Sequence, residues 1–63
     1  MAKIVMEGRE WEVKRRINVL RFLEKEGINP EEVLVLINGK VVTEDAVMEP
    51  QDEVKILWVL SRG

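Results

Sequence analysis

Residues 33–42 read Val-Leu-Val-Leu-Ile-Asn-Gly-Lys-Val-Val, and this stretch decides the kind of fold that the chain can adopt. Its first five residues are apolar without interruption, which is typical of a strand buried on both faces. Asn38-Gly39 is the strongest short hairpin signal, because both residues tolerate a positive φ angle. Lys40–Val42 returns as a short strand, so the stretch predicts a β-hairpin with a buried first strand.

The N-terminal segment predicts a second hairpin. Ile4–Met6 is a short apolar run that ends at Glu7-Gly8-Arg9, and polar and apolar residues alternate strictly over Glu10–Lys14. Strict alternation is what a half-buried strand requires, because successive side chains point to opposite faces. We therefore expect an antiparallel pair in which Gly8 supplies a positive φ angle in the turn.

Between the two hairpins the hydrophobic period becomes that of a helix. Over Arg16–Glu26 the apolar residues gather on one side when they are spaced at about 100° per residue. Gly27 stands where a helix C-cap glycine belongs, and Pro30 prevents the helix from continuing. One amphipathic helix is expected here.

The remainder of the chain predicts turns and one more strand. Thr43–Met48 is polar enough for a surface turn or one helical turn, Pro50–Asp52 makes a further turn, and the last strand runs from Glu53 to about Val59. The element order is thus β-β-α-β-β-β, an α+β fold with one helix packed on one face of a mixed sheet. Residues 1–63 form one domain with a short flexible tail at 61–63, and the uncovered sheet face meets water or a partner.

Composition excludes several classes of site. The 63 residues contain no cysteine and no histidine, which excludes disulfides, zinc sites of the Cys/His kind, thiol nucleophiles and Ser-His or Cys-His dyads. Ten basic against twelve acidic residues give a net charge of −2, so we expect neither a nucleic-acid nor a membrane partner. Met1-Ala2-Lys3 leads directly into a strand-like run, and the longest wholly apolar stretch is too short to span a bilayer. The expectation is a soluble cytoplasmic domain, and the 35% charged residues are typical of a thermophilic source.

Two stretches carry a family signature. Leu36–Val42 looks like the strand, Asn-containing turn and return strand of the β-grasp sulfur carriers of the ThiS and MoaD type, which are ubiquitin-like proteins of this size. Gln51–Leu57 looks like the turn into that family's last strand. The resemblance covers essentially the whole chain and implies the β-grasp fold.

The resemblance implies a carrier rather than an enzyme. In the family an E1-like activating enzyme uses ATP to adenylate the carboxylate of the terminal glycine, which is then converted to a thiocarboxylate. A sulfur-accepting synthase receives the sulfur for the thiazole of thiamine, for molybdopterin of the molybdenum cofactor or for thiolated tRNA, and some relatives are conjugated to lysines instead. On this resemblance Gly63 is the reactive residue, Ser61 and Arg62 belong to the tail, and the chain itself binds no metal or cofactor.

Two departures from the family pattern leave alternatives open. Arg62 stands where the family has its penultimate glycine, and Gln51 replaces a glycine of the preceding turn. Three explanations of Arg62 are open. The activating partner is adapted to an Arg-Gly ending, the chain has lost the carrier role, or the natural chain ends differently. The competing hypothesis is a β-grasp interaction module that binds a partner through its open sheet face without tail chemistry.

Further candidate residues lie in the last strand. Leu57 and Val59 share one face, and they are either covered by the first hairpin or form an exposed docking patch. Trp58 points the other way, and it is either a core residue or a recognition residue, since tryptophan is enriched at interface hot spots.

The longest concentration of one charge comprises Lys14, Arg15, Arg16, Arg21 and Lys25. It is either a solvated helix face or a patch that meets an acidic partner and raises the association rate. The adjacent carboxylate pairs on the predicted loops lack the spacing of a calcium loop, so no metal site is expected.

Overall fold

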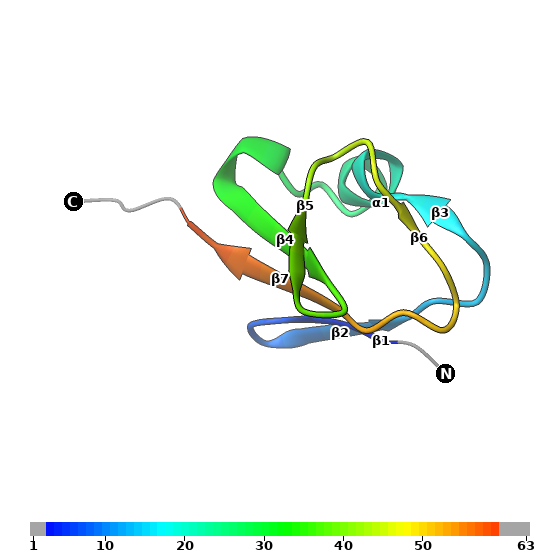
Figure 1. Cartoon of the computed structure of the whole chain (residues 1–63). Coiled ribbons are helices and arrows are strands. Elements are labelled where there is room, and N and C mark those ends of the chain that lie inside the picture. The colour runs from blue at the N-terminus through cyan, green and yellow to red at the C-terminus, as the bar shows by residue number, and fades with distance from the viewer. Residues whose placement is uncertain (1–2, 60–63) are drawn as a thin grey trace.

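The computed structural model describes residues 3–59, in which one α-helix covers one face of a mixed sheet (Figure 1). The elements are β1 Lys3–Met6, β2 Arg9–Glu12, β3 Ile17–Asn18, α1 Val19–Lys25, the 3-10 helix η1 Pro30–Glu32, β4 Val33–Ile37, β5 Lys40–Val42, β6 Val47–Met48 and β7 Val54–Trp58. The sheet order is β2-β1-β7-β4-β5, and β3 pairs with β6 beside the helix. Strands β1 and β7 are parallel and the other neighbours antiparallel, which confirms the α+β, β-grasp architecture.

Both predicted hairpins are present. Strands β4 and β5 have the predicted bounds, and the turn between them holds Asn38 at φ 53° and Gly39 at φ 84°. Two successive positive φ angles are those of a type I′ turn, whose twist matches that of the flanking strands. Gly8 has φ 77° between β1 and β2, also as expected. The proposed tail at 61–63 lies outside the described residues.

The Asn38 side chain does more than permit the turn. Its Nδ2 donates to Asp52 Oδ1 at 3.0 Å, and its Oδ1 accepts from the Glu53 N–H at 2.9 Å. The backbone N–H of Asn38 also donates to the Glu53 carbonyl at 2.7 Å, and Asp52 Oδ2 accepts from the Glu49 N–H at 2.9 Å. Asn38 therefore joins the β4–β5 turn to the turn before β7.

Substituting Asn38 separates these two roles. Asn38→Ala is expected to lower the free energy of unfolding by about 1–3 kcal/mol, since it removes two hydrogen bonds and places alanine at a positive φ angle. This is a large part of the roughly 3–9 kcal/mol expected for a domain of this length. Asn38→Gly keeps the backbone freedom but removes both bonds, so urea unfolding should place it between the wild type and Asn38→Ala. If Asn38→Gly is as stable as the wild type, the side-chain bonds contribute nothing.

The helix begins three residues later than predicted. The periodicity favoured a start at Arg16, but Ile17-Asn18 form β3, and α1 starts at Val19. The side chain of Asn18 caps the helix by accepting from the Arg21 N–H at 3.0 Å. The first helical N–H groups donate to distant carbonyls, Val19 to Ala46 at 2.9 Å and Leu20 to Glu44 at 3.1 Å. The prediction was wrong here because these partners come from the far end of the chain.

The C-terminal end of α1 confirms the role of Gly27. This glycine has φ 73°, and its N–H donates to the Glu24 carbonyl at 3.1 Å. The next N–H, of Ile28, donates to the Leu23 carbonyl at 2.8 Å. These two bonds are the Schellman motif, which ends the helix by satisfying its last carbonyl groups.

Several other boundaries differ from the prediction. Strand β2 ends at Glu12 rather than Lys14, because its ladder with β1 runs only from Arg9–Met6 to Glu12–Lys3. Residues 44–45 form the expected surface turn, but Val47-Met48 form β6, not a helical turn, and Met48 is 1% exposed. The last strand is Val54–Trp58, one residue shorter at each end than predicted.

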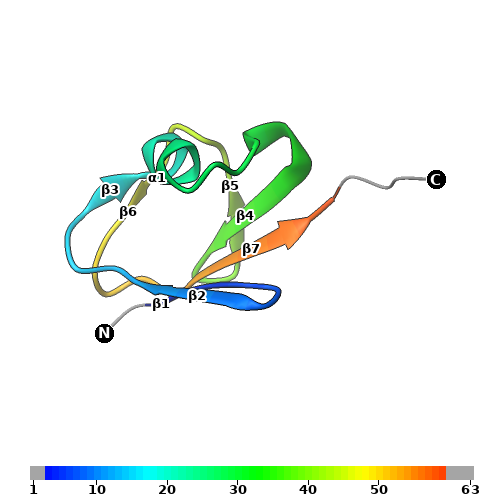
Figure 2. The same ribbon diagram turned by 180° about the vertical axis from the view of Figure 1, so that it is seen from behind.

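The core lies between the helix and one sheet face. Figures 1 and 2 show α1 on one side of the five strands, with the opposite side uncovered. The buried side chains are those of Ile4, Met6, Val13, Val19, Phe22, Leu23, Ile28, Val33, Val35, Met48, Val54 and Ile56. Within residues 3–59, no helix has both the length and the apolar character needed to cross a membrane.

Candidate functional site

The candidate site is the sheet face that α1 leaves uncovered, termed the open face. The strand registers place one residue from each of the five strands in a row across it. From β2 to β5, this row is Glu10, Val5, Lys55, Leu36 and Val41. Leu34 and Leu57 are cross-strand partners in a second row, nearer the C-terminal end of β7. Because side chains alternate between the two faces of a strand, all seven share the open face.

Most side chains around the central Lys55 on this face are apolar. Val5, Val41 and Leu57 are 39%, 60% and 43% exposed, while Leu34 and Leu36 are partly buried beside them. The charged groups lie among and beside them, and Lys3 Nζ is 3.7 Å from Glu10 Oε1 at the β2 side. An exposed apolar area bordered by charges is typical of a protein interaction site.

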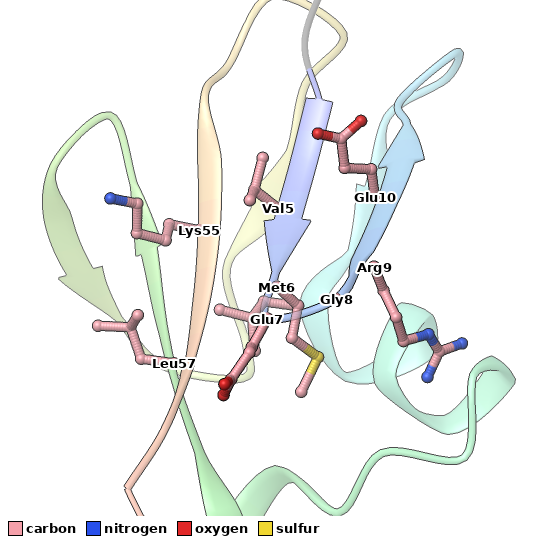
Figure 3. A pocket seen from close by; sticks show the side chains of 9 residues that line it. Val5, Met6, Glu7, Gly8, Arg9, Glu10, Lys55 and Leu57 are labelled. Carbon is pink, nitrogen blue, oxygen red and sulfur yellow. The ribbon is translucent and has the colours of Figure 1, made fainter.

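A hollow of about 630 Å³ lies where β1 ends and β7 continues (Figure 3). The pairing of β1 with β7 stops at Met6–Ile56, whereas the pairing of β7 with β4 continues to Trp58. Val5, Lys55 and Leu57 project to one side of the strands in Figure 3, and Arg9 projects toward α1. Leu57 therefore lies at the open face beside a part of β7 that β1 does not flank.

The structure divides the predicted docking residues between the two faces. Leu57 is on the open face, and Val59, which is 52% exposed, follows it two positions later with its N–H donating to the Glu32 carbonyl at 3.0 Å. Trp58 pairs with Val33 and shares the helix side with Ile56, yet it is 50% exposed. Neither Leu57 nor Val59 is covered by the first hairpin, and Trp58 is not a buried core residue. The tail residues Ser61, Arg62 and Gly63 lie outside the described residues.

Sequence reasoning missed four apolar residues of the open face. Val5, Leu34, Leu36 and Val41 were assigned to strands but not to the candidate patch. Leu36 and Val41 are cross-strand partners on β4 and β5. A two-residue hairpin at Asn38-Gly39 requires this pairing, so the turn signal contained the missing information.

The charged groups of the described residues form no metal centre. Within residues 3–59, no group of three or more carboxylate side chains has the geometry to hold a metal ion. The expectation that the chain binds no cofactor stays a prediction. What the open face presents is apolar contact area with Lys55 at its centre.

Comparison with known proteins identifies the family. Residues 3–60 match the family model described as small archaeal modifier protein 2. The chain belongs to this family. No curated protein matches the sequence. Membership in the small archaeal modifier family agrees with the resemblance to ubiquitin-like sulfur carriers that the sequence motifs indicated.

A solved structure supports the same relationship. The crystal structure of the thiamine biosynthesis protein ThiS from Geobacter metallireducens superimposes on this small archaeal modifier family member with a TM-score of 0.67. The two are 25% identical, and the match covers 97% of this chain and 99% of ThiS. The ThiS/MoaD-type fold predicted from the sequence is therefore confirmed.

Proposed function

We propose that the chain is a sulfur carrier or protein modifier that acts through the carboxylate of Gly63. An E1-like enzyme uses ATP to adenylate this carboxylate, with loss of pyrophosphate, and a sulfur donor then displaces AMP to leave a thiocarboxylate. The chain is the substrate of this chemistry rather than an enzyme. The observation that carries the proposal is the match of almost the whole chain to the small archaeal modifier family.

The described structure supports a division of roles along the chain. Strand β7 lies in the middle of the sheet between β1 and β4, and its last residue, Trp58, leads toward the C-terminus. The open face beside it offers Leu57 and Val41 as apolar contacts for the activating enzyme. A partner that holds this face receives the tail in a fixed orientation, and such positioning lowers the entropic barrier to reaction. The proposed location is the cytoplasm, where ATP and reduced sulfur donors are present.

The first test measures the conversion itself. The full chain is incubated with its activating enzyme, ATP and a sulfur donor, and the intact mass is expected to rise by the difference between one sulfur and one oxygen. Omitting ATP is the control, because a bare carboxylate is too poor an electrophile to react without activation. If the mass does not change with an enzyme that converts another carrier, the proposal is wrong.

The sulfur acceptor is also part of the proposal. Thiazole synthesis for thiamine, molybdopterin synthesis and tRNA thiolation each require a different synthase, which is the second partner. Adding each synthase with its substrate to the thiocarboxylate form should return the carrier to its original mass in one case. Covalent attachment to lysines of other proteins would appear instead as larger conjugates in denaturing gels.

The competing function is a β-grasp module that binds partners without tail chemistry. The residue that favours it is Arg62, whose long side chain replaces the family's penultimate glycine. Removing residues 61–63 distinguishes the two functions, since a binding module keeps its function and a carrier loses it.

A further inference from the structure

A second surface carries charge that the proposed function does not use. A groove of about 480 Å³ lies between β2, the segment 13–17 and α1. All five residues of the basic cluster line it, namely Lys14, Arg15, Arg16, Arg21 and Lys25. Among the described residues, two carboxylates, those of Glu12 and Glu26, share the lining, so these lining residues have a net charge of +3 on a chain of net charge −2.

Within residues 3–59, most of these cations form no ion pair. In the described part of the chain, the salt bridges near the groove join Arg16 to Glu49 at 3.7 Å and Arg9 to Glu26 at 3.1 Å. Within residues 3–59, no ion pair is formed by the other four cations of the cluster, which are Lys14, Arg15, Arg21 and Lys25. All four are exposed and therefore accessible to a ligand. Arg21 and Lys25 are also four positions apart on α1, and like charges at this spacing destabilise a helix by a few tenths of a kcal/mol.

The floor of the groove is apolar and partly aromatic. It contains Ile4, Trp11, Val13, Ile17 and Phe22. The rings of Trp11 and Phe22 meet edge to face with centroids 5.1 Å apart. The guanidinium carbon of Arg9 lies 4.5 Å from the Trp11 centroid, so a cation already occupies that ring face.

This floor favours a protein ligand over a nucleic acid. Single-stranded nucleic acids bind by stacking bases on open aromatic faces, and here Arg9 and Phe22 already pack against Trp11. A peptide with both carboxylates and apolar side chains matches the unpaired cations and the floor together. Strand β2 is an edge of the five-stranded sheet, and edge strands pair with extended segments.

We propose that this groove binds an extended acidic segment of a partner protein, with carboxylates on Lys14, Arg15, Arg21 and Lys25 and an apolar side chain over the floor. The groove is on the helix side of the sheet, whereas the partner-binding surface for activation is the open face. A protein can therefore occupy the groove while an activating enzyme holds the opposite face. This inference is independent of the chemistry proposed for Gly63.

The test uses Trp11 as the reporter. In a Trp58→Phe variant, Trp11 is the remaining tryptophan, and its fluorescence is expected to change when a synthetic peptide of alternating glutamate and isoleucine is added. The affinity should fall as salt is raised, because exposed charge pairs are screened. Reversing both helix charges with Arg21→Glu and Lys25→Glu should weaken binding by at least about ten-fold.

A matched control removes the effect of total charge. Lys40→Glu with Lys55→Glu changes the net charge by the same amount, but neither residue lines the groove. Peptide affinity should therefore change less than about three-fold.

Arg21→Gln with Lys25→Gln is a milder pair of substitutions for the case in which charge reversal unfolds the helix, and circular dichroism checks the fold. Equal losses in the two charge-reversed pairs would contradict a specific groove. So would tighter binding of a uridine oligonucleotide than of the peptide, with the same dependence on Arg21 and Lys25.

Discussion

Deleting Gly63 is expected to abolish formation of the thiocarboxylate while leaving the fold intact. The new terminal residue is then Arg62, whose carboxylate lies one residue short of the reacting position and carries a long cationic side chain. A misplacement of about 1 Å costs roughly 100-fold in rate, and the loss of a whole residue moves the carboxylate much further. Intact-mass measurement after incubation with the activating enzyme, ATP and a sulfur donor reads the result directly.

Two controls accompany this deletion, one of stability and one of the residue at position 62. Urea unfolding should show the same midpoint for the deletion and the wild type, because within residues 3–59 the buried core residues lie between Ile4 and Ile56. Loss of stability on deletion would mean that Gly63 is structural rather than reactive. Arg62→Gly restores the family's Gly-Gly ending and should be converted at least as fast as the wild type. Slower conversion of this variant would indicate a partner adapted to Arg-Gly.

Placing a charge on the open face is expected to have the second large effect. Leu57→Glu should weaken binding of the activating enzyme by at least about 30-fold, since hot-spot residues contribute about 2 kcal/mol or more and the new carboxylate has no partner in an apolar contact. Isothermal titration calorimetry measures the affinity without requiring catalysis. The stability cost to the free protein should be small, because Leu57 is 43% exposed.

Two matched variants show whether the effect belongs to this face. Val47→Glu introduces the same charge at a 39% exposed valine on β6, away from the five-stranded sheet. Trp58→Glu alters the neighbouring residue on β7, whose side chain lies on the helix side. Both should bind the enzyme within about three-fold of the wild type, as surface substitutions outside an interface usually have small effects. Equal weakening by Val47→Glu would exclude the open face as the docking surface.

Local chemistry made several elements predictable from the sequence. The β4–β5 hairpin follows from Asn38-Gly39, because only residues that tolerate positive φ angles form this turn. The end of α1 follows from Gly27 for the same reason. In the last strand, Val54 and Ile56 are buried and Lys55 is exposed. This alternation could be predicted because successive side chains of an extended chain point to opposite faces.

Other features depended on partners far away along the chain. The start of α1 is fixed by the carbonyl groups of Glu44 and Ala46, which accept hydrogen bonds from Leu20 and Val19. The strands of the β3–β6 ladder have two residues each, too few to show a period. Asp52 meets Asn38 across 14 positions in sequence, so the turn residues alone did not indicate this contact.

The sequence by itself determined the two hairpins, the helix, the last strand, the order of these elements and the family, because these depend on backbone preferences and on the alternation of apolar residues. Tertiary structure decided which residues form surfaces. Val5, Leu36 and Val41 come together on the open face only through the strand order, and Arg21 and Lys25 reach Lys14 only when α1 packs beside β2. A binding surface is a set of neighbours in space, and the sheet register and helix packing that create those neighbours are long-range properties of the folded chain.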